Sequence, residues 1–175
     1  FVLAIGTLIT PSRTWDAGLE AAVEVGTGLT LLLIAQGALW ARPTFGVFWT
    51  WDPRLTTSAI MLVAFAGVLS LRSFAEDFGR RAVWTAAATI VAYIDVPLVY
   101  FIVKLAPRGI HQQHSSPDTV SAIYHLPLRL NAFAVLFLAT WMIIRRAKIT
   151  LLRDAEQISP PATEPASGEP LVAGR

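Results

Sequence analysis

Four long apolar windows constrain the fold of this chain more than any other feature. They cover residues 19–40, 55–74, 82–105 and 128–144, and a helix needs roughly 20 mostly apolar residues to cross a bilayer. In lipid, a crossing segment of this kind must satisfy its own backbone hydrogen bonds, which favours helices. We therefore predict an all-α membrane protein, in which four complete transmembrane helices form a bundle.

The composition supports this fold class. Hydrophobic residues make up 54% of the 175-residue chain and charged residues only 15%, whereas a soluble domain carries about 25% charged residues. A net charge of +2 is too small to indicate a nucleic-acid partner. Because the chain has no cysteine, a disulfide, a thiolate metal site or a redox thiol within it is excluded.

The two ends of the chain predict its domain organisation. The apolar run 1–10 is too short for a span and lacks the charged start and cleavage site of a signal peptide. We interpret it as the remnant of another transmembrane helix, so that the chain is an N-terminally truncated fragment. Residues 11–148 then form the membrane domain, and 149–175, rich in proline, alanine and glutamate toward the end, form a disordered cytoplasmic tail.

Charged residues near the span ends predict the orientation in the membrane. The larger basic group should face the cytoplasm; it consists of Arg13, Arg72, Arg80, Arg81, Arg145, Arg146, Lys148 and Arg153. Glu20 and Glu24 lie in the first turns of the 19–40 window, where the helix dipole favours carboxylates. The loops 41–54 and 106–127 then share the outer face, so together they could build one site.

The first of these loops is rich in aromatic residues. Trp40, Trp49 and Trp51 occur with Phe45 and Phe48 between them. Flat rings stack on flat apolar ligands, and the indole N–H adds a hydrogen-bond donor. The alternative is an ordinary belt of interfacial aromatic residues. We favour ligand binding for 48–52 and leave both interpretations open for Trp40.

Proline and glycine should interrupt helical structure in this loop. Pro43 and Gly46 are expected to keep residues 40–58 from forming one straight helix, and Asp52-Pro53 should add a further turn.

All three histidines, His111, His114 and His125, lie in the second loop. A neutral imidazole can be an axial ligand of haem iron or a zinc ligand, although zinc would need further ligands. We interpret His114 and His125 as solvated surface residues.

A carboxylate, Asp95, lies near the middle of the 82–105 window, just before Pro97. Such a residue inside a membrane indicates a function or a buried partner. Equally, Pro97 could kink the helix and admit water, and we leave both interpretations open.

The aromatic segment also carries a resemblance. The stretch Phe45-Gly-Val-Phe48-Trp49-Thr-Trp51-Asp52-Pro-Arg54-Leu55-Thr56 resembles the tryptophan-rich WWD signature of haem-handling membrane proteins of cytochrome c biogenesis. Its ending favours the haem exporter protein C (CcmC) family, and Ile110-His111-Gln112 resembles the second outer-loop histidine of that family. The similarity covers roughly 20–148. Phe45 and Phe48 stand where the family usually has tryptophan.

The resemblance implies a function in haem transfer. Members hold non-covalent haem b on the periplasmic side of the bacterial inner membrane, between the tryptophan-rich loop and two axial histidines. They pass it to a membrane-anchored periplasmic haem chaperone, with ABC transporter subunits and a small membrane subunit of the cytochrome c maturation system. Carried over to this sequence, His111 would be one axial ligand of the haem iron, and the other would lie upstream of Phe1.

The predicted site therefore has a porphyrin lying flat against Phe48, Trp49 and Trp51. Asp52 is expected to hold the loop in place by accepting N–H bonds. The complete set of predicted haem-binding residues is His111, Trp49, Trp51, Phe48, Asp52, Trp40, Arg54 and Arg108, with Arg42 and Arg129 as further candidates for the propionates. No catalytic residue is predicted. The alternatives are a haem lyase, which would form thioether bonds to apocytochrome, and a structural membrane subunit without a cofactor.

Overall fold

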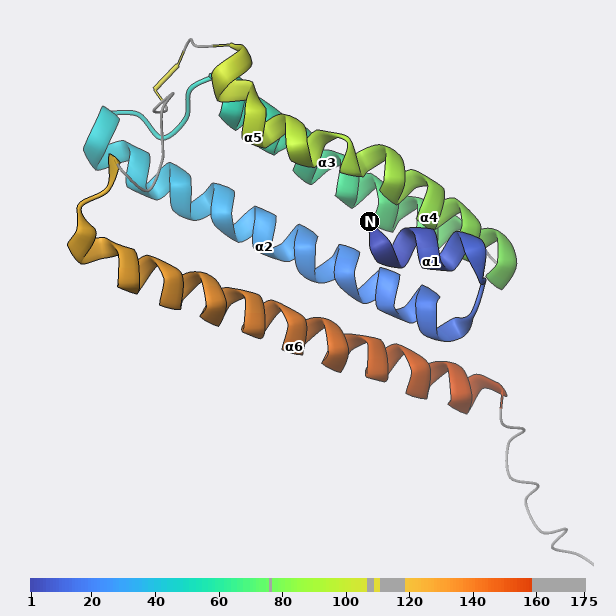
Figure 1. Ribbon diagram of the computed structural model, residues 1–175. Helices are drawn as coiled ribbons and strands as arrows, with labels where there is room; N and C mark the ends of the chain where they lie inside the picture. Colours follow the sequence, from blue (N-terminus) through green and yellow to red (C-terminus); the bar gives the residue numbers. More distant parts are fainter. Residues whose placement is uncertain (76, 107–108, 111–118, 159–175) are drawn as a thin grey trace, which may run out of the picture.

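The computed structural model describes residues 1–75, 77–106, 109–110 and 119–158. Its elements are α1 (Val2–Ile9), α2 (Arg13–Phe45), α3 (Pro53–Phe74), α4 (Phe78–Tyr93), α5 (Asp95–Leu105), the short 3₁₀ turn η2 (Ala122–Tyr124) and α6 (His125–Ile158) (Figure 1). No strand occurs in these ranges. Four segments are long and apolar enough to cross a membrane: α2, α3, α4 together with α5, and η2 with most of α6. The predicted all-α membrane fold is confirmed.

Helix α2 extends beyond the predicted 19–40 window at both ends. With 33 residues it is about 50 Å long, whereas the hydrocarbon core of a bilayer is about 30 Å thick. Its N-terminus is capped by Ser12, whose hydroxyl accepts the Trp15 N–H at 3.3 Å. One or both ends of α2 therefore project out of the hydrocarbon.

Residues 40–58 do not form one straight helix, as predicted, but the break lies at Gly46 and not at Pro43, because α2 continues through Pro43 to Phe45. Pro43 lies in the last turn, where the hydrogen bonds around it persist: the Thr44 hydroxyl donates to the Trp40 carbonyl at 3.0 Å. The helix ends at Gly46, which has a φ of 79° and donates its N–H to the Arg42 carbonyl. The connection to α3 is therefore 46–52, shorter than the predicted loop 41–54.

The predicted third span is divided into two helices. Helix α4 ends at Tyr93, and α5 begins at Asp95 after the single residue Ile94. Pro97 has no N–H to donate to the Tyr93 carbonyl one turn back, and the expected distortion next to Asp95 is confirmed. One carboxylate oxygen of Asp95 is buried without a hydrogen-bond partner in the described chain.

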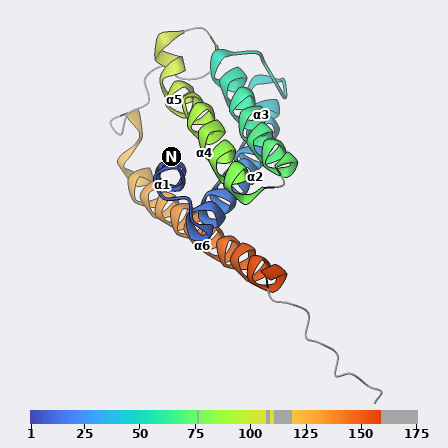
Figure 2. The ribbon, with the colours of Figure 1, turned by 90° about the vertical axis from the view of Figure 1, so that its right-hand side faces the viewer.

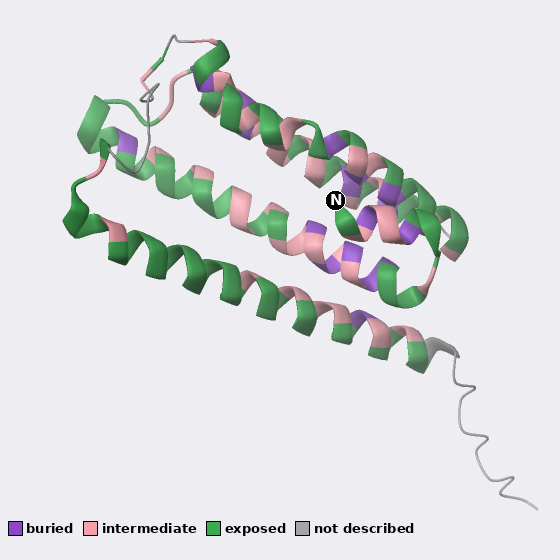
Figure 3. Ribbon diagram, in the orientation of Figure 1, coloured by how far each residue is buried: buried purple, intermediate pink, exposed green. Residues whose placement is uncertain are grey.

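Small and branched side chains from the four helices α1, α2, α3 and α4 pack into one core. Its buried members are Ala4, Leu19, Val23, Val68, Ala86 and Ala92. Figure 3 shows buried residues concentrated where α1 lies between α2 and α4, and α6 almost entirely exposed. Among the described helices α6 packs mainly on α2, and Figure 2 shows it running across α2 and away from α3 to α5. An exposed helix this rich in apolar side chains suits a lipid-facing position.

Helix α6 also corrects two predicted boundaries. It starts at His125 and continues to Ile158, so it exceeds the window 128–144, and 149–158 are helical instead of part of a disordered tail. Polar contacts explain the extension, because Arg13 binds Asp154 with 3.1 Å between nitrogen and oxygen, and Arg146 donates to Thr150 at 2.6 Å. Residues 159–175 lie outside the described residues.

Candidate functional site

The aromatic segment 46–52 connects α2 to α3 at one end of the bundle (Figure 1). Its rings are largely open to the surroundings: Trp51 is 80% exposed and Phe48 is 54% exposed, while Trp40 on the last turns of α2 is 61% exposed. Exposed rings at a helix end form a surface that a flat apolar ligand can reach.

The two indoles of the segment are perpendicular. The ring centroids of Trp49 and Trp51 are 5.7 Å apart, with an angle of 82° between their planes. A single flat ligand cannot stack on both, so the predicted porphyrin lying flat against Phe48, Trp49 and Trp51 together does not fit this arrangement. Trp51 offers its exposed ring for stacking, whereas Trp49 is partly buried.

Two buried polar atoms in the segment have no hydrogen-bond partner in the described chain. They are the indole Nε1 of Trp49 and the hydroxyl oxygen of Thr50. An unsatisfied buried donor costs about 1–3 kcal/mol, so a polar ligand group at this position would relieve that cost.

Arginine and aromatic side chains surround the segment in local pairs. The Arg42 guanidinium lies 5.3 Å from the centre of the Phe48 ring and donates to the Gly46 carbonyl. Trp40 packs edge-on against Phe45 of the same helix, with 5.6 Å between centroids. Arg54 is exposed and has no carboxylate partner within the described ranges. It is thus available to an anionic group, whereas Arg42 already has partners.

Asp52 fixes the end of the segment. It is 6% exposed and caps α3, where its carboxylate accepts the Leu55 N–H at 2.7 Å. This is the N–H bond expected of it. Gly109, just beyond α5, packs directly on Asp52: a Cβ added to this glycine would lie 2.9 Å from the Asp52 Cβ, and the glycine has a φ of 146°. The two loops predicted to share one face therefore meet at the same end of the bundle.

The predicted histidine site is described only in part. His111, His114 and Arg108 lie outside the described residues. His125 forms a hydrogen bond of 2.9 Å between its Nε2 and the Val120 carbonyl at the start of α6. Within the described ranges no group of three histidine, aspartate or glutamate side chains could hold a metal ion.

The opposite end of the bundle holds an ion-pair cluster that the sequence analysis missed. Both Arg72 Nη atoms lie 2.7 Å from Asp16 carboxylate oxygens, and Nη2 also lies 3.1 Å from Glu20. Asp16 is 1% exposed and Arg72 is 7% exposed. This bidentate pair binds α2 to α3 inside the bundle.

The same carboxylates extend the cluster to α6. Arg146 Nη2 donates to Glu24 at 2.8 Å, and Thr150 donates to Glu20 at 3.3 Å. Asp16, Glu20 and Glu24 are spaced four residues apart, which places them along one face of a helix. That spacing is the signal that the sequence offers, but it predicts Glu20 and Glu24 only as partners of the helix dipole.

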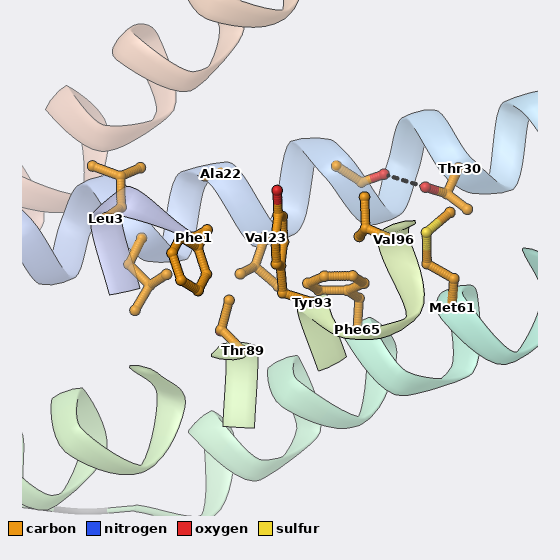
Figure 4. Close-up of a pocket in the computed structure, with 12 residues that line it drawn as sticks. Phe1, Leu3, Ala22, Val23, Thr30, Met61, Phe65, Thr89, Tyr93 and Val96 are labelled. Atoms are coloured by element: carbon orange, nitrogen blue, oxygen red, sulfur yellow. Dashed lines mark hydrogen bonds between the residues drawn. The ribbon is translucent and has the colours of Figure 1, made fainter. Parts of the chain in front are cut away.

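An apolar cavity of about 260 Å³ lies inside the bundle (Figure 4). Leu3, Val23, Met61 and Phe65 are among its lining residues, and the rings of Phe1 and Tyr93 meet at its edge with 4.9 Å between centroids. Its polar side-chain groups are hydroxyls, of which that of Thr30 already donates to the Gly26 carbonyl. No residue of 46–52 lines it, so this cavity is separate from the aromatic surface.

The fold and the exposed segment define a multi-pass helical membrane protein with an aromatic surface at one end of the bundle. Residues 1–159 match the model of the family described as heme exporter protein C (CcmC). The chain belongs to this family.

Individual relatives agree with the family match. The chain is 33% identical over 142 residues to heme exporter protein C of Paracoccus denitrificans, covering 78% of this chain and 59% of that protein. It is 29% identical over 153 residues to the Bradyrhizobium diazoefficiens protein of the same name, covering 85% and 58%. For the Escherichia coli K12 protein the values are 26% over 157 residues, 87% and 63%. The chain thus spans about three fifths of the length of these curated relatives.

Proposed function

We propose that this protein binds haem at the aromatic segment, on the periplasmic face of the bacterial inner membrane. It then transfers the haem to a membrane-anchored haem chaperone during c-type cytochrome maturation. The family match and the name heme exporter protein C of its relatives support this function. The observation that carries it is the exposed Trp51 ring beside the unpartnered Trp49 N–H, on a segment that packs against Gly109 through Asp52.

The residues present fit the chemistry of haem b, which has a flat apolar macrocycle and two carboxylates. Trp51 stacks on the macrocycle, and Phe48 extends the apolar contact. The Trp49 N–H donates to a carboxylate at the edge of the macrocycle, and the exposed Arg54 neutralises its charge.

His111 supplies an axial ligand in this proposal. It follows Gly109 by two residues, and two residues of extended chain span at most about 7 Å. Since Gly109 touches Asp52, an imidazole at position 111 is within reach of a macrocycle on Trp51. Neutral imidazole is a common axial ligand of haem iron.

The exposure of the surface suits transfer more than storage. A haem stacked on a ring that is 80% exposed keeps one face accessible to a chaperone, and hand-off requires that its affinity be overcome. The ABC transporter subunits and the small membrane subunit of the maturation system are proposed partners. In this function the protein is a transport component, and no residue of it has to form or break a covalent bond.

A spectroscopic comparison of two histidine variants tests the proposal. We expect His111→Ala to lose or shift the Soret band of the haem-loaded protein, purified in mild detergent. His125→Ala is the matched control and should keep the wild-type spectrum, because His125 bonds to Val120 at the start of α6. An unchanged Soret band in His111→Ala would remove His111 from the site, and a protein that takes up no haem at all would contradict haem binding.

A further inference from the structure

A groove of about 510 Å³ lies between α2 and α6, far along both helices from the aromatic segment. The two helices run side by side in Figure 1. Apolar residues form most of its walls: Val25, Leu29 and Leu32 from α2, and Trp141, Met142 and Ile149 from α6. Gly28 leaves it open, because a Cβ added there would meet no atom within 4 Å. At Gly28, therefore, no side chain blocks the groove to an extended apolar chain.

The groove also has charged lining residues, and their charges are unevenly paired. These residues are Glu24, Arg145 and Arg146. Arg146 is paired with Glu24 and also lies near Glu20. Arg145 is exposed, lies 5.8 Å from the centre of the Trp141 ring, and has no carboxylate partner among the described residues. Since Glu24 is already paired with Arg146, the groove carries an excess positive charge at Arg145.

We propose that this groove binds an anionic phospholipid. The phosphate lies against the Arg145 guanidinium, and one acyl chain runs along the groove past Gly28 toward Leu32. The position of the charge supports a lipid, because Arg145 directly follows the predicted span 128–144 and the apolar walls of the groove continue into the predicted spans. Basic pockets between transmembrane helices are a recognised kind of site for anionic head groups. No residue of the aromatic segment 46–52 lines the groove, so this proposal does not depend on the proposed haem surface.

Native mass spectrometry of the detergent-purified protein tests the charge requirement. Wild type should retain added phosphatidylglycerol more strongly than phosphatidylcholine with the same acyl chains. Arg145→Gln should weaken phosphatidylglycerol retention about fivefold, the effect of one basic residue near an anionic lipid, whereas Arg145→Lys should restore most of it. Arg153→Gln is the matched control, because it removes an exposed charge of the same helix that does not line the groove.

The second variant, Gly28→Leu, tests the path of the acyl chain without changing any charge. It should lower retention of both lipids, while the helical circular dichroism and the elution volume stay as in wild type. Equal retention of the two lipids by wild type would overturn the proposal, as would wild-type retention in both Arg145→Gln and Gly28→Leu. A co-purifying small polypeptide that Gly28→Leu releases, with phosphatidylglycerol retention unchanged, would assign the groove to a partner helix and contradict lipid binding.

Discussion

Trp49 and Trp51 are neighbours in the aromatic segment, but they present different chemistry. Trp51 turns an exposed ring outward, while Trp49 holds an unpartnered N–H in a partly buried position. Their perpendicular planes mean that one ring can stack on a flat ligand while the other meets its edge. The pair therefore combines apolar contact with a directed donor, which three coplanar rings could not provide.

Removing the aromatic ring of Trp51 should weaken haem binding more than replacing it with the ring of phenylalanine. Trp51→Ala loses stacking worth roughly 1 kcal/mol, so haem affinity should fall about fivefold. Trp51→Phe keeps an aromatic face and should lose much less. The measurement is haem titration followed at the Soret band, with Trp84→Ala as a control because Trp84 is an exposed tryptophan of α4, outside the aromatic segment. Equal affinity of Trp51→Ala and wild type would argue against stacking on this ring.

Gly109 is the residue whose small size lets the two loops meet. Gly109→Ala should cost about 1–3 kcal/mol, because its φ of 146° disfavours a side chain and the new Cβ would press on Asp52. We expect a lower apparent Tm and weaker haem uptake, measured by thermal unfolding and Soret absorbance.

Substitutions at two other glycines separate the backbone strain at Gly109 from its contact with Asp52. Gly46→Ala meets no atom within 4 Å but also has a positive φ, so it should show backbone strain alone, about 1 kcal/mol. Gly37→Ala, in the helix interior with open space around it, should be neutral or slightly stabilising. If all three variants unfold at the same temperature, the contact between Gly109 and Asp52 contributes nothing measurable.

At the scale of elements, three carboxylates of α2 link this helix to several others by ion pairs. Asp16 and Glu20 bind Arg72 of α3, Glu24 binds Arg146 of α6, and Arg81 of α4 approaches Asp16 at 3.8 Å. One face of α2 thus makes ion pairs with three other helices. Most of these residues lie near helix ends, where charged groups are close to the membrane boundary.

Breaking the buried pair should destabilise the bundle strongly. Arg72→Met leaves Asp16 and Glu20 without their main cation, and loss of one partner of a buried pair costs about 3–5 kcal/mol. Arg80→Gln, an exposed neighbour on α4, should change stability by less than about 0.5 kcal/mol. Apparent Tm in detergent measures both. In the double variant Asp16→Asn with Arg72→Met, the loss should be smaller than the sum of the single losses; full additivity would show that the pair does not couple.

The sequence predicted the existence of these elements better than their ends. Apolar windows located every long helix, because lipid requires both the length and the composition. The ends depend on contacts that a window cannot show. Helix α2 ends at Gly46, three residues beyond Pro43, and salt bridges to α2 accompany the extension of α6 to Ile158. Cap residues such as Asp52 were visible in the sequence, but their geometry was not.

At the scale of the whole molecule, the meeting of the two loops could be predicted from topology alone. An even number of crossings between the aromatic loop and the histidine loop puts both at one end, and the contact of Gly109 with Asp52 agrees. The perpendicular indoles and the groove between α2 and α6 could not be predicted, because both depend on how particular side chains pack. The residue pattern gives the location of the candidate site, and packing determines its shape.

The orientation of the whole molecule remains a prediction, and the chain offers a direct test because it has no cysteine. Ser73 lies near the end of α3, directly after Arg72 of the larger basic group, and is exposed. Val47 lies in the aromatic segment and is 42% exposed. Basic residues at span ends favour the cytoplasmic side, so Ser73→Cys should react with a membrane-impermeant maleimide only after the cells are opened. Val47→Cys should react in intact spheroplasts. Both variants are conservative at exposed positions, so their helices should insert as in wild type, and labelling after solubilisation controls for reactivity. The reverse labelling pattern would place the aromatic surface on the cytoplasmic side, where a periplasmic chaperone could not collect haem from it.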